Sequence, residues 1–505
     1  MALLGYALSQ LILGLDSGYS AVKKGVVIAL LSVNTVVLAV LWFGSIKDFV
    51  FSTSYALLHK KLDKKYADIK PVEINPETAP RVLLLYCTCN DFNAEALTEC
   101  AKQDYPNFKT VILDDSSKFE YIREINKYRI LNPSVEVVRR KVHSGYKAGN
   151  LNNYLADRTD YDYFVVLDSD EVIPHDYIQG VLKYFAYNPN CGAVQAKHKA
   201  QCGENVFQRL MGLCVGSNGE TVQVIKNFYG ANALIGHGMT ISRACYEKTG
   251  GFPLVVAEDI SFAVEIKNAG LDIIYAPDIN NSKMAWFEKL DIKLSHYSLP
   301  IVPVLSFLLA VCTICLGFLG YPVIYYSVAV YGIMILFLCS PMIPDFFVYK
   351  RTKNIFLLLP YFVVNVATYA SLAPMMLKTI LLGVLGKKAT FIVTPKQSEK
   401  FSLGEVLKYT CDSLLFGAAI GVAAWFACGS ILPVIFIVVG CALAPFIVAL
   451  SNITLRKTAE RQGQKSTQSN RPSNVYKVPS GAKNLIRIKK STTVYNYRQD
   501  NSVEL

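Results

Sequence analysis

Three long stretches without a charged side chain constrain the fold of this chain most. They cover residues 25–45, 294–344 and 413–455, which are 21, 51 and 43 residues long. A helix needs about 20 apolar residues to cross a bilayer, so the first stretch predicts one membrane span. Glycine and proline interrupt the other two at 317–322 and 429–433, which divides each into two spans. The sequence therefore predicts a membrane protein with five spans.

Basic residues on both sides of 354–386 set the topology. Lys350, Arg351 and Lys353 precede this apolar segment, and Lys387 and Lys388 follow it. Cytosolic loops are enriched in Lys and Arg, so both flanks are expected in the cytosol and the segment cannot cross once. We expect an interfacial or re-entrant helix there. The alternative is an ordinary sixth span, which would reverse the side of the C-terminal tail.

These boundaries give a plan of the whole chain, with the N-terminus outside and the soluble domain and tail inside. The expected segments are an N-terminal segment 1–24, a transmembrane helix 25–46, a cytosolic domain 47–296 with an interfacial helix near 283–296, two spans in 297–344, the interfacial or re-entrant helix 354–386, a loop 387–400, two spans in 411–455 and a basic disordered tail 456–505.

The positive charge of the chain belongs mainly to this tail. The net charge is +12, and residues 452–505 contain 11 Lys and Arg against 3 Asp and Glu. No zinc-finger or RNA-binding signature accompanies it. We therefore expect no nucleic-acid partner, and the tail fits contact with anionic lipid.

Between about residues 80 and 277, short apolar runs alternate with polar stretches. Expected strands are 81–86, 110–113, 135–138, 163–167 and 192–195, and expected helices are 94–103, 118–131, 145–155, 174–187 and 260–269. Strands that alternate with helices indicate a mostly parallel sheet with both faces covered. The fold class is therefore an α/β domain inserted in an α-helical transmembrane bundle.

Acidic side chains recur at four places in this domain, the first three just after a predicted strand. They are Asp91, the pair Asp114 and Asp115, the pair Asp168 and Asp170, and the pair Glu258 and Asp259. Open α/β sheets bind ligands at the carboxyl ends of their strands. Each place alone reads equally well as an acidic turn or a helix N-terminus, but four in one domain indicate a site.

The pair in Asp168-Ser-Asp170 suits a divalent cation. Residues two apart in a strand point the same way, and carboxylate oxygens are ligands for Mg²⁺ or Mn²⁺. The alternative is an acidic turn after a buried strand.

Two further segments give the series a family resemblance. Residues Lys147-Ala-Gly-Asn-Leu-Asn152 and Phe391-Ile-Val-Thr-Pro-Lys396 resemble the donor-site segment and the gating loop of cellulose synthases. Over about residues 80–450 the chain resembles the inverting family 2 glycosyltransferases of GT-A type. The likeness is to the membrane-embedded processive synthases of cellulose, hyaluronan and chitin.

The resemblance implies a donor site for a UDP-sugar. It places Asp91 and Asp114 at the uridine, with Asp115 either beside them or supporting the turn, and Lys147 at the diphosphate. It makes Asp168 and Asp170 ligands of Mg²⁺ or Mn²⁺, with Asp168 also at the donor. Thr394 and Lys396 would reach the diphosphate when the gating loop closes.

The resemblance also implies a catalytic base and an acceptor site. Asp259 would take the proton from the attacking acceptor hydroxyl, with Glu258 beside the acceptor. His237, between two glycines, would contact a sugar, although a histidine in such a place is more often a turn residue. The family's Gln-x-x-Arg-Trp motif is absent, because Ser282 and Ala285 stand in the Gln and Arg places before Trp286. Trp286 would therefore stack on the acceptor sugar without the help of that glutamine and arginine.

The predicted function is a processive enzyme at the plasma membrane. It would polymerise a hexose, with UDP-glucose favoured by the gating-loop likeness, into a β-linked polysaccharide and export it. Its partners are the UDP-sugar, the growing polysaccharide and the lipid bilayer, and a homo-oligomer is left open. The alternatives are a non-processive transferase acting on a lipid, and a catalytically impaired scaffold or export partner.

Overall fold

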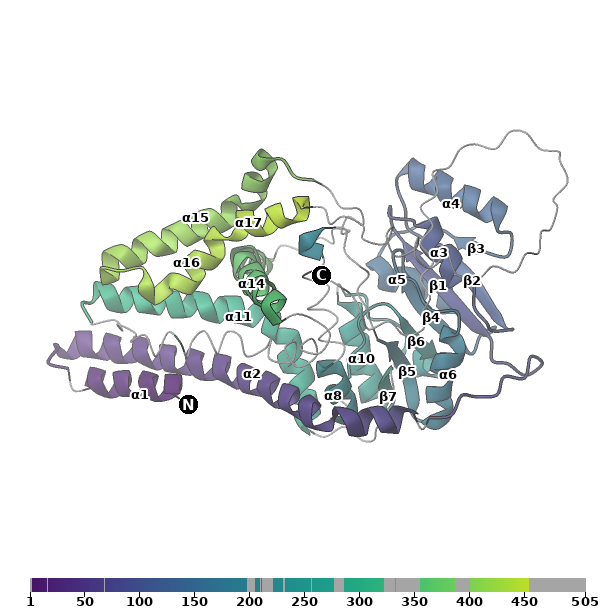
Figure 1. Ribbon diagram of the computed structural model, residues 1–505, viewed down its shortest axis with the longest axis horizontal. Coiled ribbons are helices and arrows are strands. Elements are labelled where there is room, and N and C mark those ends of the chain that lie inside the picture. The colour runs from purple at the N-terminus through teal and green to yellow at the C-terminus, as the bar shows by residue number, and fades with distance from the viewer. Residues whose placement is uncertain are drawn as a thin grey trace, which may run out of the picture.

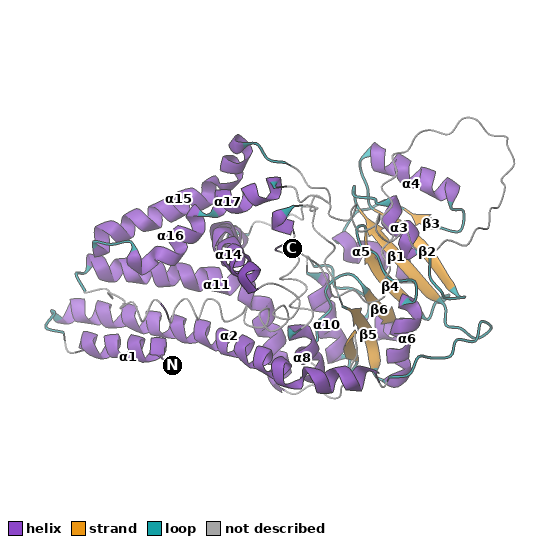
Figure 2. Cartoon of the chain, in the orientation of Figure 1, coloured by secondary structure: helices purple, strands orange, loops and turns teal. Residues whose placement is uncertain are grey.

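The computed structural model places an α/β domain beside a bundle of long helices (Figures 1 and 2). The residues it describes are 2–15, 17–67, 69–197, 205–208, 210, 221–229, 232–255, 257–276, 286–321, 332, 355–386 and 400–453. Structural statements below refer to these residues.

A seven-stranded sheet forms the centre of the α/β domain, in the order β3-β2-β1-β4-β6-β5-β7. Its strands are β1 Val82–Thr88, β2 Phe108–Asp114, β3 Glu136–Val138, β4 Tyr163–Asp168, β5 Cys191–Ala196, β6 Met239–Ser242 and β7 Asp272–Ala276. Only β6 runs antiparallel to its neighbours, β4 and β5. The five strands expected from the sequence are all present. Strands β6 and β7 were not expected, and the antiparallel strand β6 makes the sheet mixed.

Helices cover both faces of this sheet, as the alternation of strands and helices predicted. They are α3 Ala94–Cys100, α4 Phe119–Leu131, α5 Tyr146–Leu155, α6 Tyr177–Tyr187, α8 Val222–Tyr229, α9 Arg243–Thr249 and α10 Glu258–Asn268. Side chains of β1 alternate between two buried clusters. Leu84 packs in the cluster that contains Ile178 of α6, and Leu85 packs in the one that contains Leu151 of α5 and Phe262 of α10.

Strand register brings three strand ends to one edge of the sheet. Thr88, the last residue of β1, pairs with Asp114, the last of β2. On the other side of β1, Cys87 pairs with Asp168, the last residue of β4. The residues that follow these strands therefore meet at the same edge, where a parallel sheet binds ligands.

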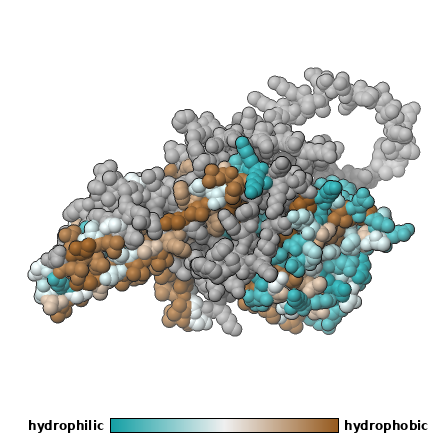
Figure 3. Space-filling view, turned by 90° about the horizontal axis from the view of Figure 1, so that it is seen from below, coloured by the Kyte–Doolittle hydropathy of each residue, from teal (hydrophilic) through white to brown (hydrophobic). Residues whose placement is uncertain are grey.

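The second part of the molecule consists of long apolar helices. They are α1 Ala2–Leu15, α2 Ala21–Ala67, α11 Trp286–Phe318, α14 Ile355–Val384, α15 Leu403–Cys428, α16 Ile435–Ala442 and α17 Ala444–Ala449. Among the described residues, four stretches are long and apolar enough to cross a bilayer: Ala21–Leu41, Pro360–Val384, Leu403–Cys428 and Leu432–Asn452. Figure 3 shows hydrophobic residues gathered over this part and hydrophilic ones over the α/β domain. The helices indicate a membrane protein.

Two predicted boundaries fall inside continuous helices. Helix α2 has 47 residues and runs through the boundary expected at 46. Helix α11 runs from Trp286 through the boundary expected at 296, so the residues expected to form an interfacial helix and the start of the next span lie in one helix. Apolar sequence marks where a helix enters lipid, but the helix itself continues wherever tertiary contacts hold it. The second span expected in 297–344 lies largely outside the described residues.

Helix α14 differs from the broken helix expected at 354–386. It is 30 residues long and continues through Pro360 and Pro374, and neighbouring helices can satisfy the backbone groups that a proline frees. Its length suits the alternative of a further span, and the interfacial placement stays a prediction. The break expected near 429–433 is confirmed: Gly429 ends α15 in the left-handed conformation, with φ of +67°.

An apolar contact joins the bundle to the α/β domain. Phe51 and Tyr55 of α2 pack against Ile225 of α8 and Tyr275 of β7, which explains why α2 continues beyond its apolar stretch. Separately, Leu210 packs on α14 and α17.

Candidate active site

Asp91 ties the end of β1 to the end of β4. Its Oδ1 accepts hydrogen bonds from Thr88 Oγ1 at 2.9 Å and from the backbone N of Cys89 at 2.8 Å. Its Oδ2 accepts from Ser169 Oγ at 2.6 Å. The turn that carries it includes Asn90 at φ of +61°, a conformation that Asn tolerates. Asp91 is therefore fixed at the sheet edge before any ligand binds.

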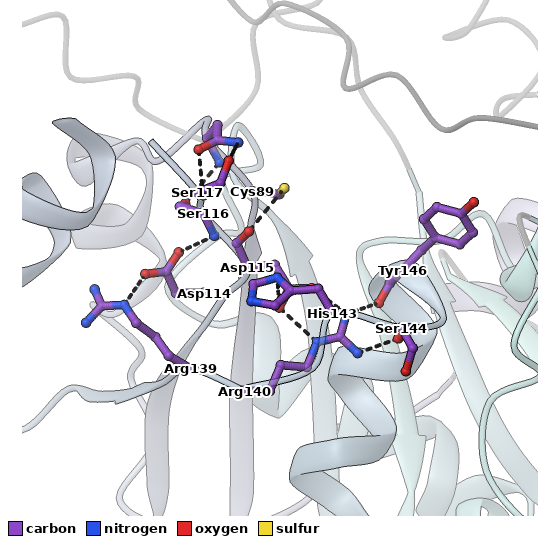
Figure 4. A network of polar contacts seen from close by, with 11 residues as sticks. Cys89, Asp114, Asp115, Ser116, Ser117, Arg139, Arg140, His143, Ser144 and Tyr146 are labelled. Carbon is purple, nitrogen blue, oxygen red and sulfur yellow. Dashed lines mark hydrogen bonds and ion pairs between the residues drawn. The ribbon is translucent and has the colours of Figure 1, made fainter. Parts of the chain in front are cut away.

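Each carboxylate of the Asp114-Asp115 pair meets an arginine (Figure 4). Arg139 Nε donates to the fully buried Asp114 Oδ2 at 2.5 Å. Arg140 binds Asp115 through two parallel hydrogen bonds, Nε to Oδ1 at 2.9 Å and Nη2 to Oδ2 at 2.6 Å. Bidentate pairs of this kind are strong and directional. Both carboxylates are thus already neutralised, and Asp115 supports a turn, as the second of its two predicted roles proposes.

Lys147 lies in the first turn of α5 and joins two strand ends. Its Nζ donates to Asp168 Oδ1 at 2.6 Å and to the carbonyl oxygen of Gly236 at 2.7 Å. Burial alone would lower the pKa of Lys147, but the charge of Asp168 outweighs it and raises the pKa to about 12. The ammonium therefore stays charged at neutral pH beside the predicted diphosphate position.

Asp168 and Asp170 have donor atoms that suit a divalent cation. About a third of the Asp168 side chain is exposed, and Asp170 is exposed. Within the described residues, no cluster of three or more His, Cys, Asp or Glu forms a complete metal site. Mg²⁺ commonly binds one or two carboxylates and completes its shell with water and phosphate oxygens. The pair fits such a cation when a diphosphate is present.

Glu171 follows this pair directly and was missed from the sequence. Its Oε2 accepts from the backbone N of Gly238 at 3.1 Å and lies 3.3 Å from His237 Nδ1. Burial alone would lower the pKa of His237, but the hydrogen bond and charge of Glu171 raise it. The sequence offered one indication that Glu171 belongs to the site, namely its position directly after Asp170. Glu171 thus brings the Gly-His-Gly turn to the Asp168 edge.

Glu258 and Asp259 begin α10 on the other side of Lys147. Burial raises the pKa of both carboxyl groups, and Lys147 acts in the opposite direction on each. Asp259 lies against Gly236: a Cβ on that glycine would be 3.2 Å from Asp259 Oδ2. Gly236 also has φ of +84°, so the glycine is required there. A buried carboxylate with a raised pKa suits a general base.

Asn152 fixes the turn that leads to Asp259. Its Oδ1 accepts from Tyr246 Oη at 3.0 Å and from the backbone N of Phe252 at 2.9 Å, and its Nδ2 donates to the carbonyl of Phe252 at 2.8 Å. The segment that resembles the donor site is therefore partly a structural support.

The remaining predicted site residues are described only in part or not at all. Trp286 is the first residue of α11, and its side chain lies outside what the structure describes. Thr394 and Lys396, with most of the predicted gating loop, lie outside the described residues. The structure therefore brings together Asp91, Asp114, Asp115, Lys147, Asp168, His237, Glu258 and Asp259. The function predicted for each stays a prediction.

Comparison with known proteins identifies the domain that carries this site. Residues 80–284 match the family model described as "Glycosyltransferase like family 2". The α/β part therefore resembles a glycosyltransferase family 2 domain, and its mixed sheet resembles the GT-A type. The match ends before the membrane helices, so the processive type stays a prediction.

Two curated relatives are glucosyltransferases by name. The chain is 26% identical over 258 residues to the β-monoglucosyldiacylglycerol synthase of Synechocystis, covering 48% of this chain and 53% of that protein. It is 27% identical over 157 residues to the glucans biosynthesis glucosyltransferase H of Shewanella baltica, covering 28% and 22%. The chain thus spans about half of the first relative and about a fifth of the second.

Among solved structures, a mannosyltransferase from Pyrobaculum calidifontis in complex with GDP-mannose and Mn²⁺ is similar to 63% of this chain. That match covers 96% of the mannosyltransferase, with 19% identity and a TM-score of 0.42.

Proposed function

We propose that this protein is a membrane-bound inverting glucosyltransferase that uses UDP-glucose, with its catalytic domain on the cytosolic face of the plasma membrane. One observation carries the proposal. Lys147 bridges the strand end that holds Asp168 and the turn that lies against Asp259. The carboxylate that would help to hold a cation and the buried carboxylate that would serve an acceptor are therefore joined through Lys147 and the Gly236 turn. The names of the two curated relatives support glucose.

The donor would bind along the edge formed by β1, β2 and β4. In the proposal Asp91 lies on the uridine side of this edge, together with Asp114, whose side chain is completely buried and paired with Arg139. Lys147 is a point charge suited to the diphosphate. Mg²⁺ or Mn²⁺ held by Asp168 and Asp170 would act as a Lewis acid that favours departure of UDP. In the predicted role of the gating loop, Thr394 and Lys396 close over the donor.

In the proposed transfer step, Asp259 takes the proton of the acceptor hydroxyl. The acceptor hydroxyl oxygen forms a bond to the anomeric carbon as the bond between that carbon and the UDP oxygen breaks. The hydroxyl proton passes to an Asp259 oxygen. Attack from the face opposite UDP turns an α-linked donor into a β-glycoside. Glu258 and Trp286 would hold the acceptor, and His237 would contact a sugar near the Gly236 turn.

The proposed acceptor is a growing β-glucan that leaves through the helix bundle. The bundle contains buried polar side chains, and Asn365 of α14 is 1% exposed with neither side-chain polar atom hydrogen-bonded. Unpaired polar groups are costly in a membrane interior. A sugar chain supplies hydroxyl groups for them.

A lipid acceptor is the second candidate. The relative from Synechocystis is named for transfer to diacylglycerol, and the missing Gln-x-x-Arg-Trp motif removes the usual stacking platform for a polymer. Such an enzyme would attach one glucose and release the product into the bilayer.

The deciding experiment uses the full chain purified in detergent. It receives Mn²⁺, single radiolabelled UDP-sugars and either no lipid or diacylglycerol, and the products are separated by size and by organic extraction. A long polymer from UDP-glucose supports the main proposal. A single labelled sugar on lipid replaces it with the second candidate. No transfer from any donor, with Asp259→Asn behaving as wild type, would leave only a scaffold or export role.

A further inference from the structure

We infer that Arg140 is a positioning residue that holds Lys147 at the diphosphate place, by locking the turn before α5 onto the end of β2. The inference deepens the proposed function and rests on it for its meaning. The contact geometry stands independently of the substrate.

All three nitrogens of the Arg140 guanidinium are engaged. Nε and Nη2 bind the Asp115 carboxylate. Nη1 donates to the carbonyl oxygen of Ser144 at 2.5 Å, and Nη2 also donates to that of Tyr146 at 2.9 Å. The side chain is only 4% exposed. Arg140 thus connects the strand that ends in Asp114-Asp115 with two carbonyl groups of the turn (Figure 4).

The turn that Arg140 holds is strained. Gly145 has φ of +69° and Tyr146 has φ of +51°, and a bulky residue with positive φ is costly unless its surroundings enforce it. The turn is also tightly closed. A Cβ on Gly149 would lie 2.0 Å from the Ser144 oxygen and 2.7 Å from Arg140 Nη1. The guanidinium therefore supplies the contacts that keep this conformation.

Lys147 follows the strained residue directly. The path of its backbone, set by Gly145 and Tyr146, decides where its Nζ falls. In the structure that atom lies between Asp168 and the Gly236 carbonyl. Asn152 fixes the C-terminal half of α5. The first turn of α5 is therefore the part that would shift if the Arg140 contacts were lost. Arg140 and Asp115 therefore link the predicted uridine side of the site to its diphosphate side.

A lysine cannot replace this arginine. An ammonium has no planar fork, so it cannot bind one carboxylate through two bonds and two carbonyls at once. Arg140→Lys keeps the charge but loses the geometry. Asp115→Asn keeps an acceptor oxygen but loses the ion pair. Arg158→Lys is the matched control, because Arg158 binds Asp160 with the same two-bond geometry at an exposed position.

The test combines amide hydrogen exchange with steady-state kinetics on the full chain in detergent. In Arg140→Lys and Asp115→Asn we expect exchange in the peptide covering 144–151 to quicken about tenfold without any substrate. We also expect kcat/KM for UDP-glucose to fall about a hundredfold, mainly through KM. Arg158→Lys should leave both quantities unchanged.

The two readouts separate the possible failures. Faster exchange in both variants supports the inference even if no sugar is transferred, in which case the proposed function is what fails. Unchanged exchange and unchanged KM in both variants would overturn the inference, whatever the transferase activity. Faster exchange with an unchanged KM would also overturn it, because Arg140 would then stabilise the turn without positioning Lys147. If Arg140→Lys does not fold, Asp115→Asn decides alone.

Discussion

The two sides of the site treat their carboxylates differently. On the side of β1 and β2, Asp91 is fully hydrogen-bonded and Asp114 and Asp115 each meet an arginine. On the side of α10, burial raises the pKa of Glu258 and Asp259, and no arginine approaches either within the described part of the chain. The first side is fixed by hydrogen bonds and ion pairs. The second side holds buried carboxyl groups with raised pKa values.

This difference suits a binding half and a reacting half. A group that only orients a ligand gains from complete hydrogen bonding, because its geometry is fixed before binding. A general base must gain and lose a proton, and a raised pKa brings it closer to working pH. Lys147 lies between the two halves. Its charge opposes the rise that burial causes in the pKa of both carboxyl groups. Single substitutions on each side of the site test this difference.

The largest effect is expected from Asp259→Asn. Removal of a general base costs about 10²–10⁴-fold in rate, so kcat should fall by that factor while KM for UDP-glucose changes little. The variant should also melt at a higher temperature at neutral pH. A carboxyl with a raised folded pKa favours the folded state when protonated and loses that stability as pH rises through the folded pKa.

Two measurements test this variant, initial rates and thermal unfolding. The gain in melting temperature should shrink as pH falls, because Asp259 becomes neutral in the wild type. Asp160→Asn, at an exposed ion pair, is the control. A variant with the wild-type kcat would remove Asp259 from the reacting half.

The next largest effect is expected from Lys147→Met. The change removes the charge beside the diphosphate and leaves Asp168 without its ammonium partner, so kcat/KM should fall about a hundredfold. The matched control is Lys109→Met, which breaks the exposed pair with Glu136 and should leave kcat/KM unchanged. Equal losses in the two variants would mean that Lys147 acts only through general stability.

Much of this division could be predicted from the sequence, because it depends on the order of neighbouring apolar and acidic residues. Apolar runs that end in Asp114 or Asp168 are strands with a carboxylate at the carboxyl end, and alternation alone places those ends on one edge. The arginine partners could not be predicted so well, because Arg139 and Arg140 reach the pair from 25 residues away. Strand β6, with four residues, and strand β7, with five, were both missed.

A moderate effect on stability is expected from Asp114→Asn. Its side chain is completely buried and accepts hydrogen bonds from Arg139 and from the backbone of Ser116. Loss of the charge should cost about 2 kcal/mol, with Arg139 still partly exposed to water. Thermal unfolding in detergent should show a lower melting temperature, whereas Asp160→Asn should not. An unchanged melting temperature would show that the binding half is not held by this pair.

The smallest expected effect is a displacement of the pH profile. Asp259 must be ionised to act as a base, and burial raises its pKa, so kcat/KM should fall on acidification at a higher pH than for an ordinary aspartate. The charge of His237 acts in the opposite direction and lowers the pKa of Asp259. In His237→Asn the acid limb should therefore move upward by a fraction of a pH unit.

Rates from pH 4 to 8 would measure this displacement, at saturating metal and with Asp160→Asn as the control. An acid limb of the pH profile that does not move, or that moves downward, would show that the Gly236–Gly238 turn does not influence the base. The charges of the two halves would then not affect one another.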